Sequence, residues 1–590
     1  MEANGTHPPP TKPGRPPRPV VGVLIDNVDD DFQRSIWAGL ESSAKEAGAS
    51  LVSLVGGNLD PAEALMVKRN RIWDLISPES VDGMVVVSTT LATHLGAGPL
   101  EEHCRRYAPL PMVSVGFPLA SMPSVVSEGQ LGMRDLVEHL LIRHGRKRLM
   151  FIGGTEQNPD TTERERIFRE TLKQHGIPID PRLIRPCDFR PDRVYAAVRQ
   201  VHGQGLDFDA VVAANDDMAI AAMDACADAG LRIPHDVSIT GFDDIPSAQR
   251  QRLPLTTVRQ PTFELARRAV QALLGILRGE PALPVERHPT QIVIRRSCGC
   301  FSETTLRAGE PRPSRRPSAT PFPQLTETIM AVLRKEGGAL LRPRGPEGIT
   351  GLVQAFVAEV GGGPGAFASR LDTELRESLA QGTSDEVWDD FLTLLRRETG
   401  GRLSPSAEAR AEALLHQARI LVKEAERQQL WKAHARLSRK MLTLQYVIDS
   451  LIGCFDTPTL LDTMARELPR IGIRRCYLSV HGSPATAFQK ARLLLAYDQG
   501  GRKNLDREGI EYPARALLPP GILDRAERVS LVYQPLIFGE EEIGFIGLEF
   551  SPQEEISSLA LAEQIRSAFK ASMIMQELRE KDRLLSKLHR

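Results

Sequence analysis

Two short polar clusters place oxygen-bearing side chains where they could recognise a small polar molecule. Asn215-Asp216-Asp217 follows the apolar run 210–214, and the strand pattern 237–241 leads into Asp243-Asp244. Carboxylate and amide oxygens accept hydrogen bonds from the hydroxyl and amino groups of a ligand. The same residue types also cap helices and form turns, so the two clusters fit either role until the fold around them is considered.

Metal chemistry has one candidate. Cys298-Gly299-Cys300 supplies half of a tetrahedral site, but no second Cys or His pair follows it at ligand spacing. The seven cysteines do not form an even-numbered set of the kind that pairs into disulfides, which favours a reducing compartment. We therefore predict no metal and no cofactor.

Catalytic motifs are missing from the sequence. It has no nucleophile elbow, no His-Glu-x-x-His and no kinase signature, and Gly539-Glu540-Glu541 lacks the Gly-Gly-Asp/Glu-Glu-Phe pattern of diguanylate cyclases. The Gly- and Arg-containing stretch 337–348 lacks the Gly-Lys-Ser/Thr ending of a phosphate loop. We predict that the protein is not an enzyme, and an unrecognised site in the carboxyl-terminal half remains an alternative.

Composition limits the partners. The 590 residues are 41% hydrophobic, and 74 Lys plus Arg against 75 Asp plus Glu give a net charge of -1, so no bulk basic field attracts nucleic acid or an anionic membrane. The first 18 residues are Pro-rich with no apolar core, and no run approaches the roughly 20 apolar residues of a membrane span. We expect a cytoplasmic protein without a membrane partner.

The elements that must position these side chains alternate regularly. Strand patterns occupy 20–25, 50–55, 83–87, 111–115, 148–152, 183–186, 210–214 and 237–241, and helical patterns such as 128–144 and 163–175 lie between them. This alternation predicts an α/β fold with doubly wound parallel sheets. Ligands bind such sheets beyond the carboxyl ends of the strands, which is where Asn215, Asp216 and Asp243 fall.

These residues also carry a family resemblance. The motifs A-N-D-D-M-A, G-L-R-I-P-x-D-V-S-I-T-G-F-D-D and P-L-T-T-V-R-Q-P resemble the effector-binding domain of the LacI/GalR repressors, from about Arg18 to Arg296. The resemblance implies a two-lobed, periplasmic-binding-protein-like fold whose chain crosses between lobes near 125–128, 260–262 and 281–284. Residues 1–18 are too few and too rich in proline for the family's helix-turn-helix, so we do not expect direct DNA binding.

The resemblance also assigns a ligand site. It implies a polar contact and a ring after the first strand, a ligand-clamping arginine, a stacking aromatic, two polar residues at strand ends and a hinge residue: Asp31, Phe32, Arg164, Phe189, Asn215, Asp243 and Gln260. The helix departs from the family by having Ile167-Phe168 in place of Gly-Phe and a second arginine, Arg166. Phe32 as a core residue and Arg164 as a surface ion pair are the alternatives. A sugar is the family's default ligand, and a nucleobase is possible.

The rest of the chain divides by composition into further segments. After a disordered tail (1–18) and the sensor (19–300), we predict a linker (301–323), a helical region (324–403), a signalling or coiled-coil helix (404–455), a GAF-like α+β domain (456–552) and a C-terminal helix (553–590). Strand patterns at 476–480, 492–496, 529–536 and 543–550 predict an antiparallel sheet. The run Y-Q-P-L-I-F-G-E-E-E-I-G-F-I-G-L-E-F resembles the final hairpin of GAF domains.

Heptad spacing in the long helix predicts a homodimer. The repeat comprises Leu414, Ala418, Leu421 and Ala425 and, after a phase shift, Leu430, His434, Leu437, Met441, Leu444, Ile448 and Leu451. Packing on the helix's own domain is the alternative.

Three functions remain open. The first is a ligand sensor that relays cleft closure through dimeric helices to the GAF-like module and to a separate output protein, a kinase, cyclase or transcription factor. The second is a LacI/GalR-type transcriptional regulator that acts on DNA directly or through a partner. The third is the unrecognised enzyme.

Overall fold

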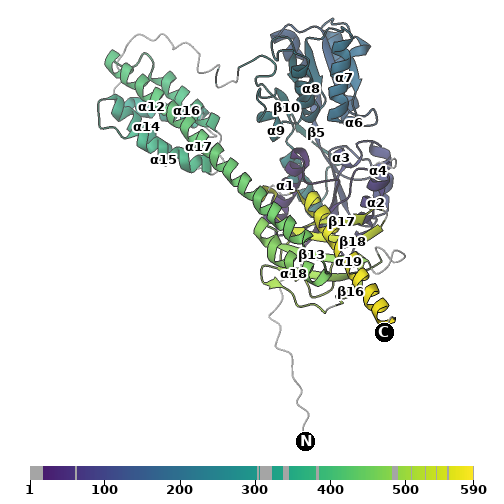
Figure 1. Ribbon diagram of the computed structural model, residues 1–590. Coiled ribbons are helices and arrows are strands. Elements are labelled where there is room, and N and C mark those ends of the chain that lie inside the picture. Colours follow the sequence, from purple (N-terminus) through teal and green to yellow (C-terminus); the bar gives the residue numbers. More distant parts are fainter. Residues whose placement is uncertain are drawn as a thin grey trace. The chain divides into compact units, whose positions relative to one another are not determined.

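The computed structural model divides the chain into two compact units, residues 1–300 with 443–590 and residues 301–442. It describes residues 18–59, 63–301, 305, 322–336, 345–380, 385–481, 489–506, 508–524, 526–539, 541–554 and 557–588. The predicted tail, apart from Arg18, and most of the predicted linker lie outside the described residues. Each unit is described by itself below (Figure 1).

The first lobe of the larger unit is built on a parallel sheet (Figure 1). Its strands run in the order β11-β5-β4-β3-β1-β2, with these bounds: β1 (Val20–Ile25), β2 (Ser50–Val55), β3 (Gly83–Val87), β4 (Met112–Val115), β5 (Ser124–Glu128) and β11 (Val285–Pro289). Helices α1 (Asp31–Glu46) and α10 (Thr262–Leu277) pack on one face, and α2 (Ala64–Asn70), η1 (Arg71–Leu75), α3 (Ser88–Leu91) and α4 (Ala97–Arg105) belong to the same lobe.

The second lobe has a separate parallel sheet in the order β7-β6-β8-β9. Its strands are β6 (Leu149–Gly153), β7 (Ile184–Pro186), β8 (Ala210–Ala213) and β9 (Ser238–Thr240), and an antiparallel pair joins β10 (Thr257–Arg259) to β12 (Gln291–Val293). Its helices are α5 (Gly129–Glu138), π-helical η2 (His139–Arg143), α6 (Pro159–Gln174), 3-10 η3 (Pro181–Leu183), α7 (Pro191–Gly203), α8 (Asp216–Asp228) and α9 (Pro246–Gln249). The predicted α/β class with parallel sheets is confirmed.

The chain crosses between the lobes three times. The first two crossings follow β5 and β10, as the resemblance implies. The third was expected near 281–284, which is wrong: β11 still pairs with β5 through Pro289, and β12 already pairs with β10 from Gln291, so the crossing lies at Thr290. The prolines at 281 and 284 precede an edge strand of the first lobe, where proline is tolerated.

The carboxyl-terminal part of the same unit continues the first lobe's sheet. β17 (Ser530–Phe538) pairs in parallel with β2 and antiparallel with β18 (Glu541–Glu549), and the order continues through β13 (Arg475–His481) and β14 (Lys490–Asp498) to β15 (Gly501–Arg502) and β16 (Ile510–Pro513). The predicted antiparallel strands and their hairpin are confirmed. Helices α18 (Thr457–Glu467) and α19 (Ser558–Leu588) share a hydrophobic core with α1 and α10, so sheet and core are both continuous across the junction.

The smaller unit is helical, as predicted. It contains α12 (Phe322–Glu336), α14 (Gly345–Val360), α15 (Phe367–Ala380), α16 (Asp385–Thr399) and the first part of α17 (Pro405–Ile452). The apolar positions singled out in the sequence, such as Leu325, Ile329 and Phe391, are buried in one core.

The long helix α17 does not present one continuous seam. Leu414, Ala418 and Ala425 are buried in the core of the helical unit. Near the other end, Leu451 is fully buried in the core of the larger unit and Leu444 packs against that core. The assignment of these positions to a dimer seam is therefore wrong, because heptad spacing also serves a helix that packs on its own domain. Between these two buried parts of α17, several large apolar side chains are exposed: Leu430, Trp431, Leu437, Met441, Leu442 and Tyr446.

Among the described residues, no helix is both long and apolar enough to cross a membrane.

Candidate functional site

A cavity of about 240 Å³ lies between the two lobes at the carboxyl ends of their strands. Six of the seven predicted site residues line it: Phe32, Arg164, Phe189, Asn215, Asp243 and Gln260. The rest of its lining is polar and acidic, and comprises Asp26, Asn27, Asp30, Gln33, Thr89, Thr90, Thr93, Asn158, Asp160 and Asp217. The cavity therefore gathers five carboxylates around a single arginine.

The seventh residue, Asp31, is not part of this lining. Its carboxylate accepts hydrogen bonds from the backbone N–H (3.0 Å) and the hydroxyl of Ser247, which lies in the first turn of α9 in the opposite lobe. Asp30, one position earlier, is the N-cap of α1 and faces the cavity. Asp31 thus joins the two lobes outside the cavity.

Arg164 is held inside the second lobe and is not a surface residue. Only 7% of it is exposed; its guanidinium donates to the carbonyl of Ala214 (2.6 Å) and lies 4.0 Å from the ring centroid of Phe242. Arg166 instead pairs with Glu163 and Glu170 on the helix surface. The structure thus decides which arginine points inward, because Arg164 lies on the buried face of α6 with Ile167 and Phe168, whereas Arg166 lies on the exposed face.

Asp243 forms a hydrogen-bonded chain with the crossing strands. Gln260 Nε2 donates to Asp243 Oδ1 (2.6 Å), and the Ser127 hydroxyl donates to Gln260 Oε1 (2.5 Å). Asp243 has φ +127°, a strained conformation for a residue with a Cβ, and such strain concentrates at ligand sites. Burial raises the pKa of Asp243, and the positive charge of Arg164 opposes this shift. The Asp243 carboxyl thus interacts electrostatically with Arg164 and, through hydrogen bonds, with Gln260 and Ser127 at two of the crossings between the lobes.

The three residues of the Asn215-Asp216-Asp217 cluster have different roles. Asn215 is the N-cap of α8, accepting from the Met218 N–H (2.9 Å), and it also lines the cavity, so the cap and ligand interpretations hold together. Asp216 points into the lobe, where it accepts from Thr257 and from the Ile245 N–H. Asp217 lines the cavity, and burial raises its pKa to about 6.

Two rings provide the apolar surfaces of the site. Phe32 in α1 contacts the cores of both lobes as well as the cavity. Phe189 adopts a left-handed conformation (φ +56°) that lays its ring on the backbone of Gly154. A Cβ at Gly154 would lie 2.1 Å from that ring, so only glycine permits this placement.

Apart from Phe32, the first lobe's contribution to the site was missed in the sequence. Asp26 and Asn27 follow β1 directly, which is the pattern used to identify Asn215 after β8. Burial raises the pKa of Asp26 to about 6. Its Oδ2 accepts from Gln33 (2.8 Å), whereas its buried Oδ1 has no hydrogen-bond partner among the described residues. A buried carboxylate oxygen without a partner costs free energy that a ligand hydroxyl would recover.

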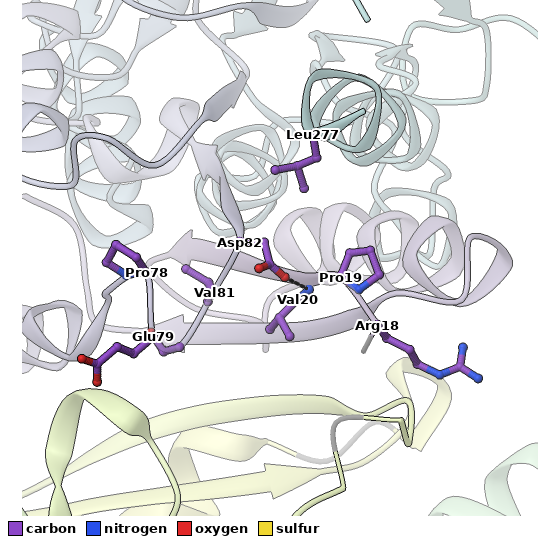
Figure 2. A pocket seen from close by; sticks show the side chains of 9 residues that line it. Arg18, Pro19, Val20, Pro78, Glu79, Val81, Asp82 and Leu277 are labelled. Carbon is purple, nitrogen blue, oxygen red and sulfur yellow. Dashed lines mark hydrogen bonds between the residues drawn. The ribbon is translucent and has the colours of Figure 1, made fainter. Parts of the chain in front are cut away.

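A second hollow lies at the amino ends of the first lobe's strands (Figure 2). It is lined by Arg18, Pro19 and Val20 at the entry of β1 and by the turn 78–82, and Asp82 accepts from the Val20 N–H (2.7 Å). Arg18 donates to the carbonyls of Ala526 and Gly48. This hollow lies at the end of the sheet opposite the ligand edge, and its side chains anchor the chain's entry into the fold.

Comparison with known proteins agrees with this architecture. Residues 137–298 match the periplasmic binding protein-like domain family, so fold and site define a ligand-binding domain of that class. Over 258 residues the chain is 30% identical to the HTH-type transcriptional repressor CytR of Escherichia coli K12, spanning 44% of this chain and 72% of CytR. Over 268 residues it is 29% identical to the ribose operon repressor of the same organism, spanning 45% and 78%. The chain belongs to the LacI/GalR family of regulators.

Among solved structures, the transcription regulator CcpA of Lactococcus lactis is similar at 21% identity and a TM-score of 0.42, covering 48% of this chain and 99% of that one.

Proposed function

We propose that residues 19–300 bind a small, uncharged molecule with several hydroxyl groups, of the sugar or nucleoside class, and that the chain regulates transcription in response. The observation that carries the ligand class is the lining of the cavity, where five carboxylates face one arginine. Carboxylates accept from hydroxyls and repel anions, so this lining selects against phosphorylated ligands. Phe32 and Phe189 offer surfaces on which a sugar or base ring can pack.

Ligand binding would be tested on the full chain by thermal shift with sugars, nucleosides and their phosphates. We expect a stabilisation of about 2.7 kcal/mol at a hundredfold excess over Kd for an uncharged ligand and none for its phosphate. Arg164→Ala should lose the response. Arg166→Ala, an exposed position on the same helix, is the matched control and should keep it. A response that Arg164→Ala retains, or one confined to phosphates, would refute the assigned site.

The output we propose is control of transcription. Kinship with HTH-type repressors supports this output and weighs against our expectation that the chain does not bind DNA. The direct route and the route through a partner differ in a gel-shift assay at stated salt, since phosphate contacts make direct binding steeply salt-dependent. A sequence-specific complex of the purified chain at about 150 mM salt would establish the direct route. We propose no enzymatic activity.

We further propose that residues 456–552 form a GAF-like module that receives the signal. The supporting contact joins Asp29, in the loop 26–30 beside the cavity, to α19, a helix that shares a hydrophobic core with strands β17 and β18 of this module. The Asp29 carboxylate accepts from the backbone N–H of Ser558 (2.9 Å) and Leu559 (3.0 Å) and from the Ser557 and Ser558 hydroxyls, which caps α19. A ligand that reorders Asp26 and Asn27 thereby bears on the start of the C-terminal helix.

A homodimer is the proposed assembly, held by the exposed part of α17. Leu437 and Met441 are 47% and 64% exposed, and an apolar strip of this kind usually meets a partner. Leu437→Glu with Met441→Glu should yield monomers by light scattering, whereas substitution of the buried Leu451 would unfold the core. If the parent chain is already monomeric at micromolar concentration, the strip has another role.

A further inference from the structure

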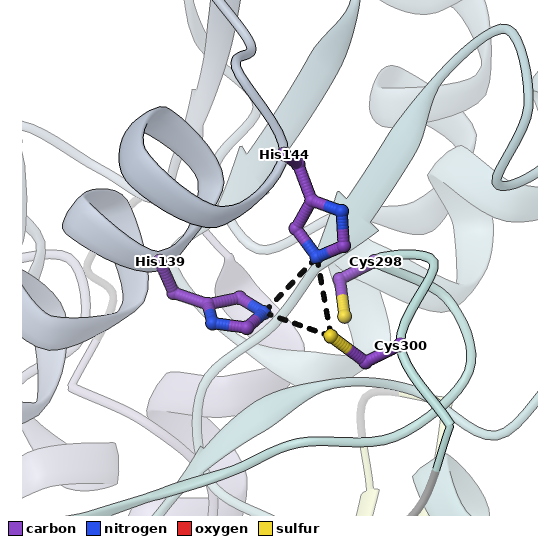
Figure 3. Close-up of side chains that lie close together, drawn as sticks. All are labelled: His139, His144, Cys298 and Cys300. Carbon is purple, nitrogen blue, oxygen red and sulfur yellow. Dashed lines mark hydrogen bonds between the residues drawn. The ribbon is translucent and has the colours of Figure 1, made fainter.

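Four side chains of the types that bind metals converge at the far end of the second lobe from the cavity. They are His139, His144, Cys298 and Cys300, and their ligand atoms all lie within 4.8 Å of one another (Figure 3). No second pair follows the two cysteines at ligand spacing, but a histidine pair precedes them in the chain, with His144 156 residues before Cys300. The fold, and not sequence spacing, brings the two pairs together.

The distances between these atoms fit a tetrahedral ion. His139 Nε2 and His144 Nε2 are 3.2 Å apart, and Cys300 Sγ lies 3.6 Å and 3.4 Å from them. Zinc bonds of about 2.0–2.1 Å to nitrogen and about 2.3 Å to sulfur, at tetrahedral angles, place two nitrogens about 3.3 Å apart and a nitrogen and a sulfur about 3.6 Å apart. Three of the ligands are thus already close to the required geometry.

A local irregularity of the helix produces the histidine pair. In a regular α-helix, residues five apart point about 140° away from each other. Here α5 ends in the π-helical segment His139–Arg143, after which His144 caps the helix, and the two rings lie 4.9 Å apart between centroids (Figure 3). Single π-turns are rare and frequently mark functional sites.

The turn that carries Cys298 and Cys300 is also held in place by specific contacts. Gly299 has φ +112°, and a Cβ at this position would lie 3.2 Å from the His144 ring. The carbonyl of Cys298 accepts from Ser238 (2.8 Å), and Ser297 donates to the carbonyl of Ile239 (2.5 Å), so β9 holds the turn. Cys298 is fully buried. Positions 297–300 are thus held rigidly opposite the two rings.

We propose that His139, His144, Cys298 and Cys300 bind one structural zinc ion. Four protein ligands leave no open position for substrate, which distinguishes a structural from a catalytic site. On binding, the ion replaces the thiol protons, which pass to solvent. The zinc would fasten the end of α5 to the last residues of the sensor, where the chain leaves the second lobe.

The test uses the untagged full chain, purified without chelator, with zinc measured by mass spectrometry against protein concentration. We expect about one equivalent, falling to less than about a fifth in Cys300→Ser and His144→Asn. Cys226→Ser removes another buried thiol of the same lobe, and His175→Asn removes the histidine at the C-cap of α6; both controls should retain the metal. Zinc content that is equal in Cys300→Ser and the parent would show an adventitious ion and overturn the proposal.

A second measurement uses the parent chain alone and so does not depend on the variants folding. Cobalt exchanged into the parent chain should show tetrahedral absorption with a thiolate charge-transfer band. A parent chain that takes up neither zinc nor cobalt, with both thiols free to react under native conditions, would also overturn the proposal. So would a disulfide between Cys298 and Cys300 in the freshly purified protein.

Discussion

The two lobes of the sensor face the same cavity but are supported differently. The sheet of the first lobe runs without interruption from β2 into β17 and the carboxyl-terminal strands, and Trp37 packs against Phe550 at 5.1 Å between ring centroids. The second lobe has a sheet of four strands of its own. Cleft closure would therefore move the second lobe against a larger block made of the first lobe and the carboxyl-terminal domain.

The same contrast holds inside the cavity. The second lobe contributes Arg164, Phe189 and Asp243, which the family resemblance identified. The first lobe contributes Asp26 and Asp30, close to the Asp29 cap of α19. A ligand held by both lobes would thus connect Arg164 of the second lobe to a block that carries α19.

The largest expected effect comes from breaking the junction strand. Val532→Pro would remove a backbone donor from β17, which pairs on both sides with β2 and β18. We expect a loss of about 3 kcal/mol or more in the free energy of unfolding, measured by urea denaturation. Hydrogen exchange should increase in β2 and β17 while β6 and β8 stay protected. Equal loss of protection in both lobes would remove the distinction drawn between them.

Next in size is the pH dependence that buried carboxyls contribute, which can be compared between the lobes with one carboxyl from each. Burial raises the pKa of Asp26 in the first lobe and of Asp217 in the second to about 6. The folded state therefore holds these protons more tightly, so stability falls as pH rises from about 4 to about 6, by on the order of 1–3 kcal/mol per group. Asp26→Asn and Asp217→Asn should each flatten part of this decline in thermal melts across that range. If both variants show the same dependence of melting temperature on pH as the parent, these two carboxyls do not cause the decline in stability.

A smaller effect should follow from removing the cap between cavity and helix. Asp29→Ala is expected to cost about 1 kcal/mol and to abolish any ligand-induced change in hydrogen exchange at the start of α19. Asp456→Ala is the matched control, since Asp456 caps α18 through the Thr459 N–H. It should cost a similar amount and leave the ligand effect intact. If the ligand changes hydrogen exchange at the start of α19 equally in both variants, the loop 26–30 has no role in passing the signal to this helix.

The smallest effect concerns an ion pair across the junction. Arg528 donates to Glu41 of α1 at 2.5 Å, and both side chains are about one-fifth exposed. Arg528→Ala should lower the free energy of unfolding by about 0.5–1 kcal/mol, less so at high salt. Arg169→Ala, which breaks a helix-surface pair in the second lobe, should cost still less. A reversed order would mean that the junction is weaker than its sheet pairing indicates.

Local patterns in the sequence predicted most of the elements, and the family resemblance identified the second lobe's half of the site together with Phe32 of the first lobe. The strand runs before Asn215 and Asp243 and the motif around Arg164 were sufficient, because each signal lies within a few residues. Asp26 and Asn27 carried the same signal after β1 and were overlooked, and Asp31 was assigned to the cavity where its neighbour Asp30 belongs.

Other features leave no local trace in a sequence. The pairing of β2 with β17 depends on two apolar strands far apart in the chain. The His139 and His144 pair depends on a π-turn that α-helical periodicity does not predict. Leu451 follows a heptad pattern whether the surface it meets is a second copy or its own domain, so spacing alone could not distinguish the two.

The junction of β2 and β17 also bears on how the protein is made. Ser50 and Val529, which meet there, are separated by 479 residues. At about 5–20 residues per second, a ribosome needs roughly half a minute to a minute and a half to supply the second strand after the first. Throughout that time the apolar edge of β2 lacks its neighbour and can pair with other chains. Newly made molecules should therefore depend on a chaperone during synthesis more than repressors whose sensor ends with its own lobes.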